Sequence, residues 1–204
     1  MTSQEADQQG PIVLILGAPG AGKGTQAKNI SKALNIPAIS TGAIFRQNMA
    51  DGTELGNRAK AYMDAGEFVP DAVTNPMVKA RLEAPDAQNG FLLDGYPRTI
   101  DQAYYLRDAL AETGRDFDLV LEVSVDFDEV VERLLKRAEV EGRSDDTEPV
   151  IRHRLEVYHE QTEPMVTYYA DQDKLVQIDG LGTVDEVWDR IYKVLDEHNL
   201  LPQN

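Results

Sequence analysis

The sequence contains no cysteine, so it can form neither a disulfide bond nor a thiolate metal site. Its three histidines, His153, His159 and His198, are spread along predicted helices and form no cluster of metal ligands. No apolar run approaches the ~20 residues that a membrane-spanning helix needs, and residues 1–10 lack the basic start and apolar centre of a signal peptide. We therefore expect a cytoplasmic protein with no membrane partner.

Positive charge is also scarce, since 20 lysines and arginines stand against 36 aspartates and glutamates, a net charge of −16. Nucleic acids and anionic membranes would repel such a chain, so neither is an expected partner. The basic residues are nevertheless concentrated, because six of the 20 lie between positions 133 and 154, where an even spread would place about two. These six are Arg133, Lys136, Arg137, Arg143, Arg152 and Arg154. We expect an anionic ligand near them.

The segment 17–25, Gly-Ala-Pro-Gly-Ala-Gly-Lys-Gly-Thr, lies between an apolar run and a helical pattern. A strand, a glycine loop and a helix in this order direct backbone N–H groups and the positive end of the helix dipole at one spot, which suits a phosphate chain. Lys23 can reach the outer phosphates. Gly24 stands where a hydroxyl usually follows the lysine, so Thr25 is the candidate for the hydroxyl near Mg²⁺. Packing alone can also require a glycine-rich turn, but the lysine, the threonine and the preceding strand together favour a phosphate site.

The remaining pattern predicts an α/β fold with one domain over 1–204, a five-stranded parallel sheet with helices on both faces. The predicted strands are 11–16, 36–40, 90–95, 118–125 and 175–179. The predicted helices are 23–34, 43–50, 54–65, 71–83, 99–113, 127–138, a stretch from 147 to 169 that Pro164 should kink or break, and 184–200. The polar segment 139–146 is predicted to be a loop.

Three charged residues follow the predicted strands at the edge where parallel sheets bind ligands. Asp94 ends the third strand, as expected of a carboxylate that orders Mg²⁺, and Arg46 and Arg98 come after the second and third strands. Arginine binds phosphate oxygens in pairs. Taken alone, both arginines could equally be ordinary surface residues. The basic residues 133–137 could likewise form a solvated helix face with Glu129 and Glu132.

Five motifs in this order resemble the adenylate kinase family, and together they span nearly the whole chain. They are 17–26, Ser40-Thr41-Gly42 with Arg46, Val69-Pro70-Asp71, the run 90–98 with Gln102, and 142–146. The resemblance implies a P-loop NTPase type of fold with an inserted nucleoside monophosphate-binding flap, 40–69, and a short lid, 136–146. It also implies a monomer that reversibly transfers the terminal phosphoryl group of MgATP to AMP, giving two ADP and maintaining the adenine nucleotide balance.

The resemblance also implies roles for individual residues. The ATP site would comprise Gly20, Ala21, Gly22, Lys23, Gly24, Thr25, Arg133, Arg137 and Gly182, with Thr25 and Asp94 near Mg²⁺ through water. The AMP site would comprise Thr41, Arg46, Glu67, Phe68, Val69, Gly95, Tyr96, Pro97, Arg98, Gln102, Arg143 and Arg154. The catalytic residues would be Lys23, Arg98, Arg137, Arg143 and Arg154, of which Arg143 and Arg154 bind the phosphoryl group in transfer.

Only five residues separate Arg137 from Arg143, and without cysteine the resemblance favours the short lid and no structural zinc. Two alternatives stay open. A pyrimidine nucleoside monophosphate kinase of the same fold tends to carry alanine in place of Thr41 and asparagine in place of Thr99 and Gln102. A nucleotide-binding switch or ATPase would need no second phosphate site such as Arg46 and Arg98 provide.

Overall fold

The computed structural model describes residues 10–141 and 147–202. Within them, five strands form one parallel sheet in the order β2-β3-β1-β4-β5, which confirms the predicted sheet. The strands are β1 (Ile12–Leu16), β2 (Ala38–Ser40), β3 (Phe91–Asp94), β4 (Leu119–Ser124) and β5 (Leu175–Asp179). The chain builds one side of the sheet first and then crosses β1 to the other side. The loop after β1 therefore lies where ligands bind in open α/β sheets.

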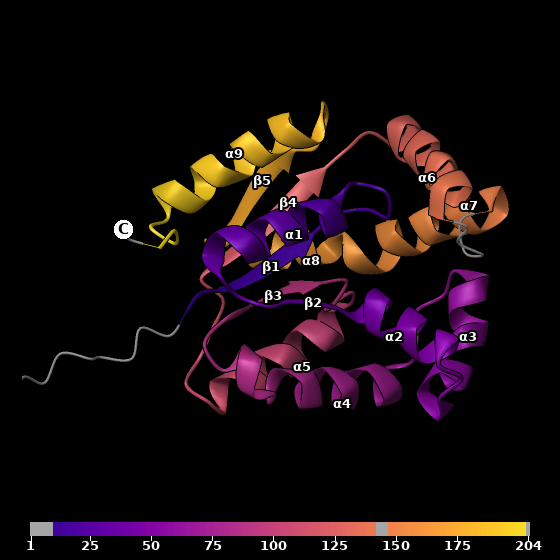
Figure 1. Ribbon diagram of the computed structural model, residues 1–204, viewed down its shortest axis with the longest axis horizontal. Coiled ribbons are helices and arrows are strands. Elements are labelled where there is room, and N and C mark those ends of the chain that lie inside the picture. Colours follow the sequence, from indigo (N-terminus) through magenta and orange to yellow (C-terminus); the bar gives the residue numbers. More distant parts are fainter. Residues whose placement is uncertain (1–9, 142–146, 203–204) are drawn as a thin grey trace, which may run out of the picture.

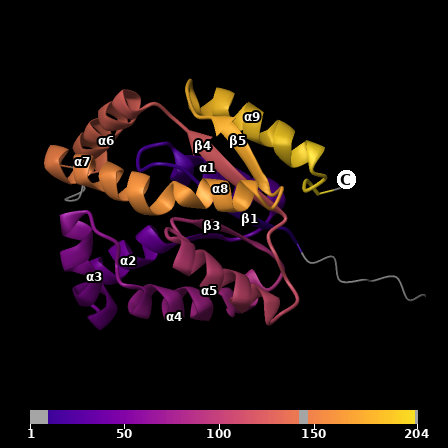
Figure 2. The same ribbon diagram turned by 180° about the vertical axis from the view of Figure 1, so that it is seen from behind.

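Alternating residues of β1 enter two different cores. Ile12, Leu14 and Leu16 pack with α4 (Asp71–Leu82), α5 (Ile100–Ala111) and α8 (Pro164–Ala170). Val13 and Ile15 pack on the opposite face with α1 (Lys23–Leu34) and α9 (Val184–Glu197). Figure 1 shows α1 and α9 in front of the sheet, and Figure 2 shows α5 and α8 on the other face. A strand covered on both faces must be apolar throughout, as β1 is.

Two helical pairs lie at the end of the sheet to which the strands point (Figure 1). The pair α2 (Thr41–Ala50) and α3 (Glu54–Ala65) follows β2 and has a small core of its own, Phe45, Ala59 and Val69. The other pair is α6 (Phe127–Glu141) and α7 (Glu148–Val157), joined through Val130, Leu134, Ile151 and Leu155. None of the described helices is long and apolar enough to cross a membrane.

Several helix ends differ from the predicted ones. The helix α2 begins two residues early because the Ser40 hydroxyl accepts a hydrogen bond from the Ala43 N–H and caps it. Thr99 is itself the cap of α5, which spans Ile100–Ala111 and not 99–113. The helix α9 ends at Glu197, short of residue 200, and α4 ends at Leu82. The structure also contains a short 3₁₀ turn, η1 (Pro85–Ala87), which was not predicted.

The predicted loop 139–146 is wrong over its first three residues, because α6 continues to Glu141. Polar residues do not end a helix when one of its faces is solvated. Residues 142–146 lie outside the described part of the chain.

Pro164 interrupts the predicted helix 147–169, as expected. A π-helical turn, η2 (Tyr158–Thr162), follows α7, and the Glu163 N–H donates across five residues to the Tyr158 carbonyl at 3.0 Å. Because proline has no N–H to donate, the wider turn lets the chain continue past it into α8 without an ordinary helical bond at that position.

Candidate active site

The loop between β1 and α1 depends on several glycines, of which Gly20 and Gly22 lie next to α6 and α1. Gly20 has a φ of 85°, and a Cβ there would lie 2.8 Å from Leu134 Cγ and 3.1 Å from the Val130 carbonyl oxygen on α6. Gly22 caps α1 in the left-handed conformation, with a φ of 91°. The loop therefore packs closely against α6, and its last residues lead directly into the positive end of α1.

Lys23 is the first residue of α1, and its side chain turns back along the loop. Its Nζ donates to the carbonyl oxygens of Gly17 at 2.7 Å and Ala18 at 2.9 Å. Burial of the ammonium lowers the pKa of Lys23 to about 8, and the nearby Asp94 carboxylate opposes that shift. Three guanidinium groups lower the pKa further, those of Arg98, Arg154 and Arg137. Together these positive groups make a site suited to several phosphate charges.

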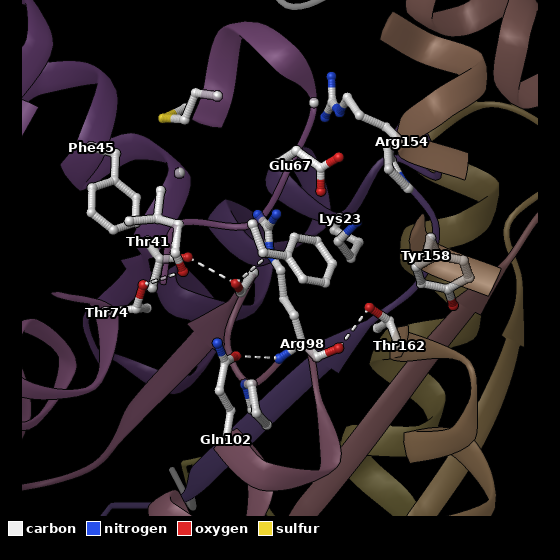
Figure 3. Close-up of a pocket in the computed structure, with 18 of the residues that line it drawn as sticks. Lys23, Thr41, Phe45, Glu67, Thr74, Arg98, Gln102, Arg154, Tyr158 and Thr162 are labelled. Carbon is white, nitrogen blue, oxygen red and sulfur yellow. Dashed lines mark hydrogen bonds between the residues drawn. The ribbon is translucent and has the colours of Figure 1, made fainter. Parts of the chain in front are cut away.

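A cavity begins beside Lys23 and extends under α2 and α3 (Figure 3). Gly95, just after β3, is the central backbone acceptor of its wall. Its carbonyl accepts from Thr41 Oγ1 at 2.8 Å and from Arg98 Nε at 2.8 Å. A Cβ on Gly95 would lie 3.1 Å from that hydroxyl and 3.2 Å from Arg98 Nη2, so the absence of a side chain allows both contacts.

Arg98 is held along its whole length. Its backbone N–H donates to Gln102 Oε1 at 2.8 Å, and its carbonyl accepts from the Thr162 hydroxyl of η2 at 2.8 Å. Its guanidinium lies over the Phe68 ring, 5.1 Å from the centroid. Figure 3 shows Lys23, Arg98 and Arg154, which come from three separate segments, around the same cavity.

The other side of the cavity joins α2 and α3 to α7. Both terminal nitrogens of Arg46 would lie 3.2 Å from a Cβ on Gly42, so glycine leaves the guanidinium room at the start of α2. At the end of α3, a Cβ on Gly66 would lie 2.9 Å from Arg154 Cγ. The next residue, Glu67, approaches His153 Nε2 of α7 with Oε1 at 2.5 Å.

Arg133 ties α6 to the loop after β5. Its Nε pairs with Glu129 Oε1 at 2.7 Å, as the solvated-face alternative expected, but its Nη1 also donates to the Gly180 carbonyl at 3.1 Å. The neighbouring Gly182 has a φ of 106°, and a Cβ there would lie 2.5 Å from Glu186 Oε2. The structure therefore requires glycine at this position even without a ligand, because a side chain would collide with the capping box of α9.

The predicted magnesium residues lie near the loop. A Cβ on Gly24 would be 3.9 Å from Asp94 Oδ2, and Thr25 is exposed in the first turn of α1. The described residues contain no group of three or more histidine or carboxylate side chains able to hold a metal. One carboxylate and one hydroxyl beside a phosphate loop fit Mg²⁺ that is bound mainly by phosphate oxygens and water.

The cavity brings together most of the predicted AMP residues. Those that line it are Thr41, Arg46, Glu67, Phe68, Val69, Gly95, Pro97, Arg98, Gln102 and Arg154, and Lys23 of the predicted ATP site lines it as well. Tyr96 does not line it, because its side chain is buried in the core and its hydroxyl donates to Asn75 Oδ1 at 2.7 Å. Burial also raises the pKa of Tyr96. A side-chain contact between Tyr96 and a ligand is therefore not part of the site.

Other predicted residues lie beside the cavity or outside the described chain. Those that do not line it are Gly20, Ala21, Gly22, Gly24, Thr25, Asp94, Arg133, Arg137 and Gly182. Arg143 lies outside the described residues. The cavity also has walls that the sequence did not indicate, namely Phe45, Met63, Gly66, Thr74, Tyr158 and Thr162. These residues belong to no single motif of the sequence, because they come from separate elements that only tertiary packing brings together.

The family model for adenylate kinase matches residues 15–174, which include the end of β1, the phosphate loop and the cavity walls after β3 and on α5 and α7. The chain belongs to the adenylate kinase family. The resemblance noted in the sequence is thus confirmed over most of its length.

Individual adenylate kinases are similar to this chain over most of its length. That of Nocardioides sp. is 56% identical over 184 residues, which cover 90% of this chain and 96% of the relative. That of Mycobacteroides abscessus is 54% identical over 183 residues, covering 90% and 98%. That of Thermobifida fusca is 52% identical over 183 residues, covering 90% and 97%. The similarity therefore covers nearly the full length of each of these relatives.

Proposed function

We propose that the protein reversibly transfers the terminal phosphoryl group of MgATP to AMP, giving two ADP. The observation that carries this proposal is the convergence of Lys23, Arg98 and Arg154 on one cavity whose far wall holds Thr41 and Gln102. A nucleotide switch or a simple ATPase needs no second anion site of this kind.

AMP would enter the cavity under α2 and α3. Arg46 and Arg98 would bind its phosphate, since a guanidinium fork matches phosphate oxygens. The base would lie toward Gln102, whose amide offers both a donor and an acceptor. The backbone of residues 67–69 would close over the nucleoside.

ATP would lie along the phosphate loop. The backbone of residues 20–25 and Lys23 would hold its phosphates, and the Arg133 and Gly182 segments would hold the base. Mg²⁺, held by phosphate oxygens with Thr25 and Asp94 nearby, would neutralise charge on the phosphates. Arg137 and Arg154 would stabilise the phosphoryl group between the two nucleotides, together with Arg143. No general base is required, because the phosphate of AMP is already ionised enough to attack.

Closure of the flap, 40–69, and the lid, 136–146, would exclude water from the reaction, because water could otherwise accept the phosphoryl group. The contact between Glu67 and His153 supports the flap as the closing part, since it joins α3 to α7 across the cavity. A monomer in the cytoplasm stays a prediction.

Phosphorus NMR of the protein with ATP, Mg²⁺ and AMP tests the reaction. The AMP and ATP signals should be replaced by ADP signals, and no ADP should form when AMP is omitted. Free phosphate that forms without AMP would instead indicate an ATPase. Side-by-side rates with AMP, CMP and UMP test the acceptor, and faster turnover of CMP or UMP would replace AMP with a pyrimidine nucleotide.

A further inference from the structure

The side-chain amide of Gln102 makes one hydrogen bond at each end, and the two partners together allow only one orientation of the amide. Its Nε2 donates to Asp71 Oδ1 at 2.6 Å, and its Oε1 accepts from the Arg98 backbone N–H at 2.8 Å. Asp71 is the first residue of α4, and Gln102 lies on α5 with only 2% of its surface exposed. Two helices and the loop after β3 therefore meet at this one amide.

The chemistry of the two partners fixes which end of the amide faces which group. An ionised carboxylate only accepts hydrogen bonds and a backbone N–H only donates them. A rotation of the amide by 180° would turn Oε1 toward the Asp71 carboxylate and the NH₂ group toward the Arg98 N–H, so both contacts would become repulsive. The orientation thus follows from the partners and not from the assignment of oxygen and nitrogen in the side chain.

The amide still has one Nε2–H and one lone pair on Oε1 for a ligand in the cavity that Gln102 lines. An adenine edge offers a donor at N6 and an acceptor at N1. Hypoxanthine offers the reverse, an acceptor at O6 and a donor at N1. An amide that can rotate satisfies either base in the same pose, whereas an amide held in one orientation satisfies only one of them.

We propose that Asp71 is a specificity-determining positioning residue that makes Gln102 select a 6-aminopurine monophosphate over a 6-oxopurine monophosphate. The inference rests on the proposed function, since it takes AMP as the ligand of this cavity. Asp71 does not touch the base. It acts through Gln102, with the Arg98 N–H as the second fixed partner.

The test is the ratio of kcat/KM for AMP to that for IMP, which differs from AMP only in the groups at positions 1 and 6. Asp71→Asn keeps the size of the side chain but can donate as well as accept, so only the Arg98 N–H still opposes the rotated orientation of Gln102. We expect the AMP to IMP ratio to fall about tenfold, the effect of one mismatched hydrogen bond. The change should be in KM and in the dissociation constants of AMP and IMP, with kcat for AMP nearly unchanged.

Asp101→Asn is the matched control, because Asp101 is an exposed carboxylate in the first turn of α5. It removes the same charge at a helix start and should leave the ratio unchanged. If Asp71 only connected α4 to α5, Asp71→Asn would weaken AMP and IMP equally, and an unchanged ratio would overturn the proposal. Asp71→Ser, which places a small group able to donate and accept at this position, serves if the asparagine variant does not fold, and the same drop is expected.

Gln102→Ala separates this inference from the proposed function. If Gln102 reads the base, Gln102→Ala loses the selectivity, and adding Asp71→Asn to it changes nothing further. If Gln102→Ala keeps the wild-type ratio, or AMP is no substrate at all, the assignment of the cavity to AMP fails. If Gln102→Ala loses selectivity while Asp71→Asn and Asp71→Ser keep it, only the role of Asp71 fails.

Discussion

Lys23 combines a positive charge with surroundings that disfavour that charge. Burial lowers its pKa to about 8, and nearby guanidinium groups act in the same direction. A bound phosphate chain would bring negative charge within reach of the ammonium and raise its pKa again. The ammonium of Lys23 is therefore poorly solvated in the free protein and favoured when an anionic ligand is bound. Shifted pKa values of this kind are common at functional sites.

Nucleotide binding should consequently take up protons through Lys23. The pKa is about 8 in the free protein and higher in the complex, so between these two values the complex holds more protons than the free protein. Affinity for ATP should fall as the pH rises through about 8. Calorimetry of ATP binding just above that pH, in two buffers of different ionisation enthalpy, measures the uptake. Lys23→Arg keeps the charge at every working pH and should abolish it; equal uptake in this variant would contradict the assignment.

His153 offers a second titration, between the flap and α7. Glu67 Oε1 lies 2.5 Å from its Nε2, and Glu156 Oε2 lies 3.7 Å from its Nδ1. Both carboxylates raise the pKa of His153, and the hydrogen bond with Glu67 is the largest cause. The charged contact is thus complete at low pH and is lost as the pH rises through the raised pKa. An NMR titration should place the midpoint above 6.5, and Glu67→Gln should lower it. Glu163→Gln removes the partner of His159 instead and should leave His153 unchanged.

Contiguous motifs predicted the residues of the phosphate loop and the arginines after β2 and β3, because a strand end fixes where the next few residues lie. Thr162 and Tyr158 could not be found in this way. Both lie in η2, the wider turn before Pro164, and both line the cavity, where the Thr162 hydroxyl donates to the Arg98 carbonyl. Asp71 belongs to a recognisable motif, but its partner Gln102 is 31 residues away, and only the structure pairs them.

At the scale of elements, the flap meets α7 at the end of α3. Gly66 caps this helix with a φ of 79°, and a Cβ there would approach Arg154 Cγ at 2.9 Å and Val150 Cγ1 at 3.1 Å. Gly52, in the turn between α2 and α3, has a φ of 65° but open space around it. The two glycines share a backbone conformation and differ in their surroundings.

This difference makes Gly66→Ala and Gly52→Ala a matched pair. Each should lower the free energy of unfolding by roughly 1 kcal/mol, the cost of a left-handed alanine. Only Gly66→Ala should also push the flap from α7, and it should raise KM for AMP about fivefold, which corresponds to ~1 kcal/mol of lost contact. Denaturant unfolding and steady-state kinetics measure the two effects. Equal KM values in both variants would show that the contact does not contribute to AMP binding.

Helix prediction succeeded where the chain carries explicit end signals. The predicted bounds of α3 are those observed, because Thr53 caps its start and Gly66 its end. It fails at the end of α6, where the polar residues predict a loop although a helix with one solvated face tolerates such residues.

At the scale of the whole molecule, alternating strand and helix patterns predicted a parallel sheet but not its order. Each crossover must be right-handed, yet the pattern does not say on which side of β1 a later strand is added. In the structure β1 pairs with β3 on one side and with β4 on the other, and β3 and β4 both contribute residues to both cores, so the burial pattern of a single strand does not reveal that choice. It depends on how whole faces pack, which no local segment of sequence records.

The charge of −16 is also a property of the whole molecule, and it predicts how stability responds to salt. Self-repulsion destabilises a compact chain of high net charge, and about 1 M salt shortens the screening length to ~3 Å. The unfolding temperature at neutral pH should therefore rise with added KCl, by about 2–4 °C for each kcal/mol gained in a chain of this size.

Paired variants test whether net charge is the cause. Glu160→Gln with Asp171→Asn removes two exposed negative charges and should flatten the dependence of unfolding temperature on KCl. Lys28→Gln with Lys32→Gln removes two exposed positive charges and should steepen it. If the salt effect came from anion binding at the phosphate loop instead, Lys23→Gln would reduce it, and neither pair would change the slope. Opposite changes in the two pairs would identify self-repulsion, because each pair removes two exposed charges and the pairs differ in the sign of the charge removed.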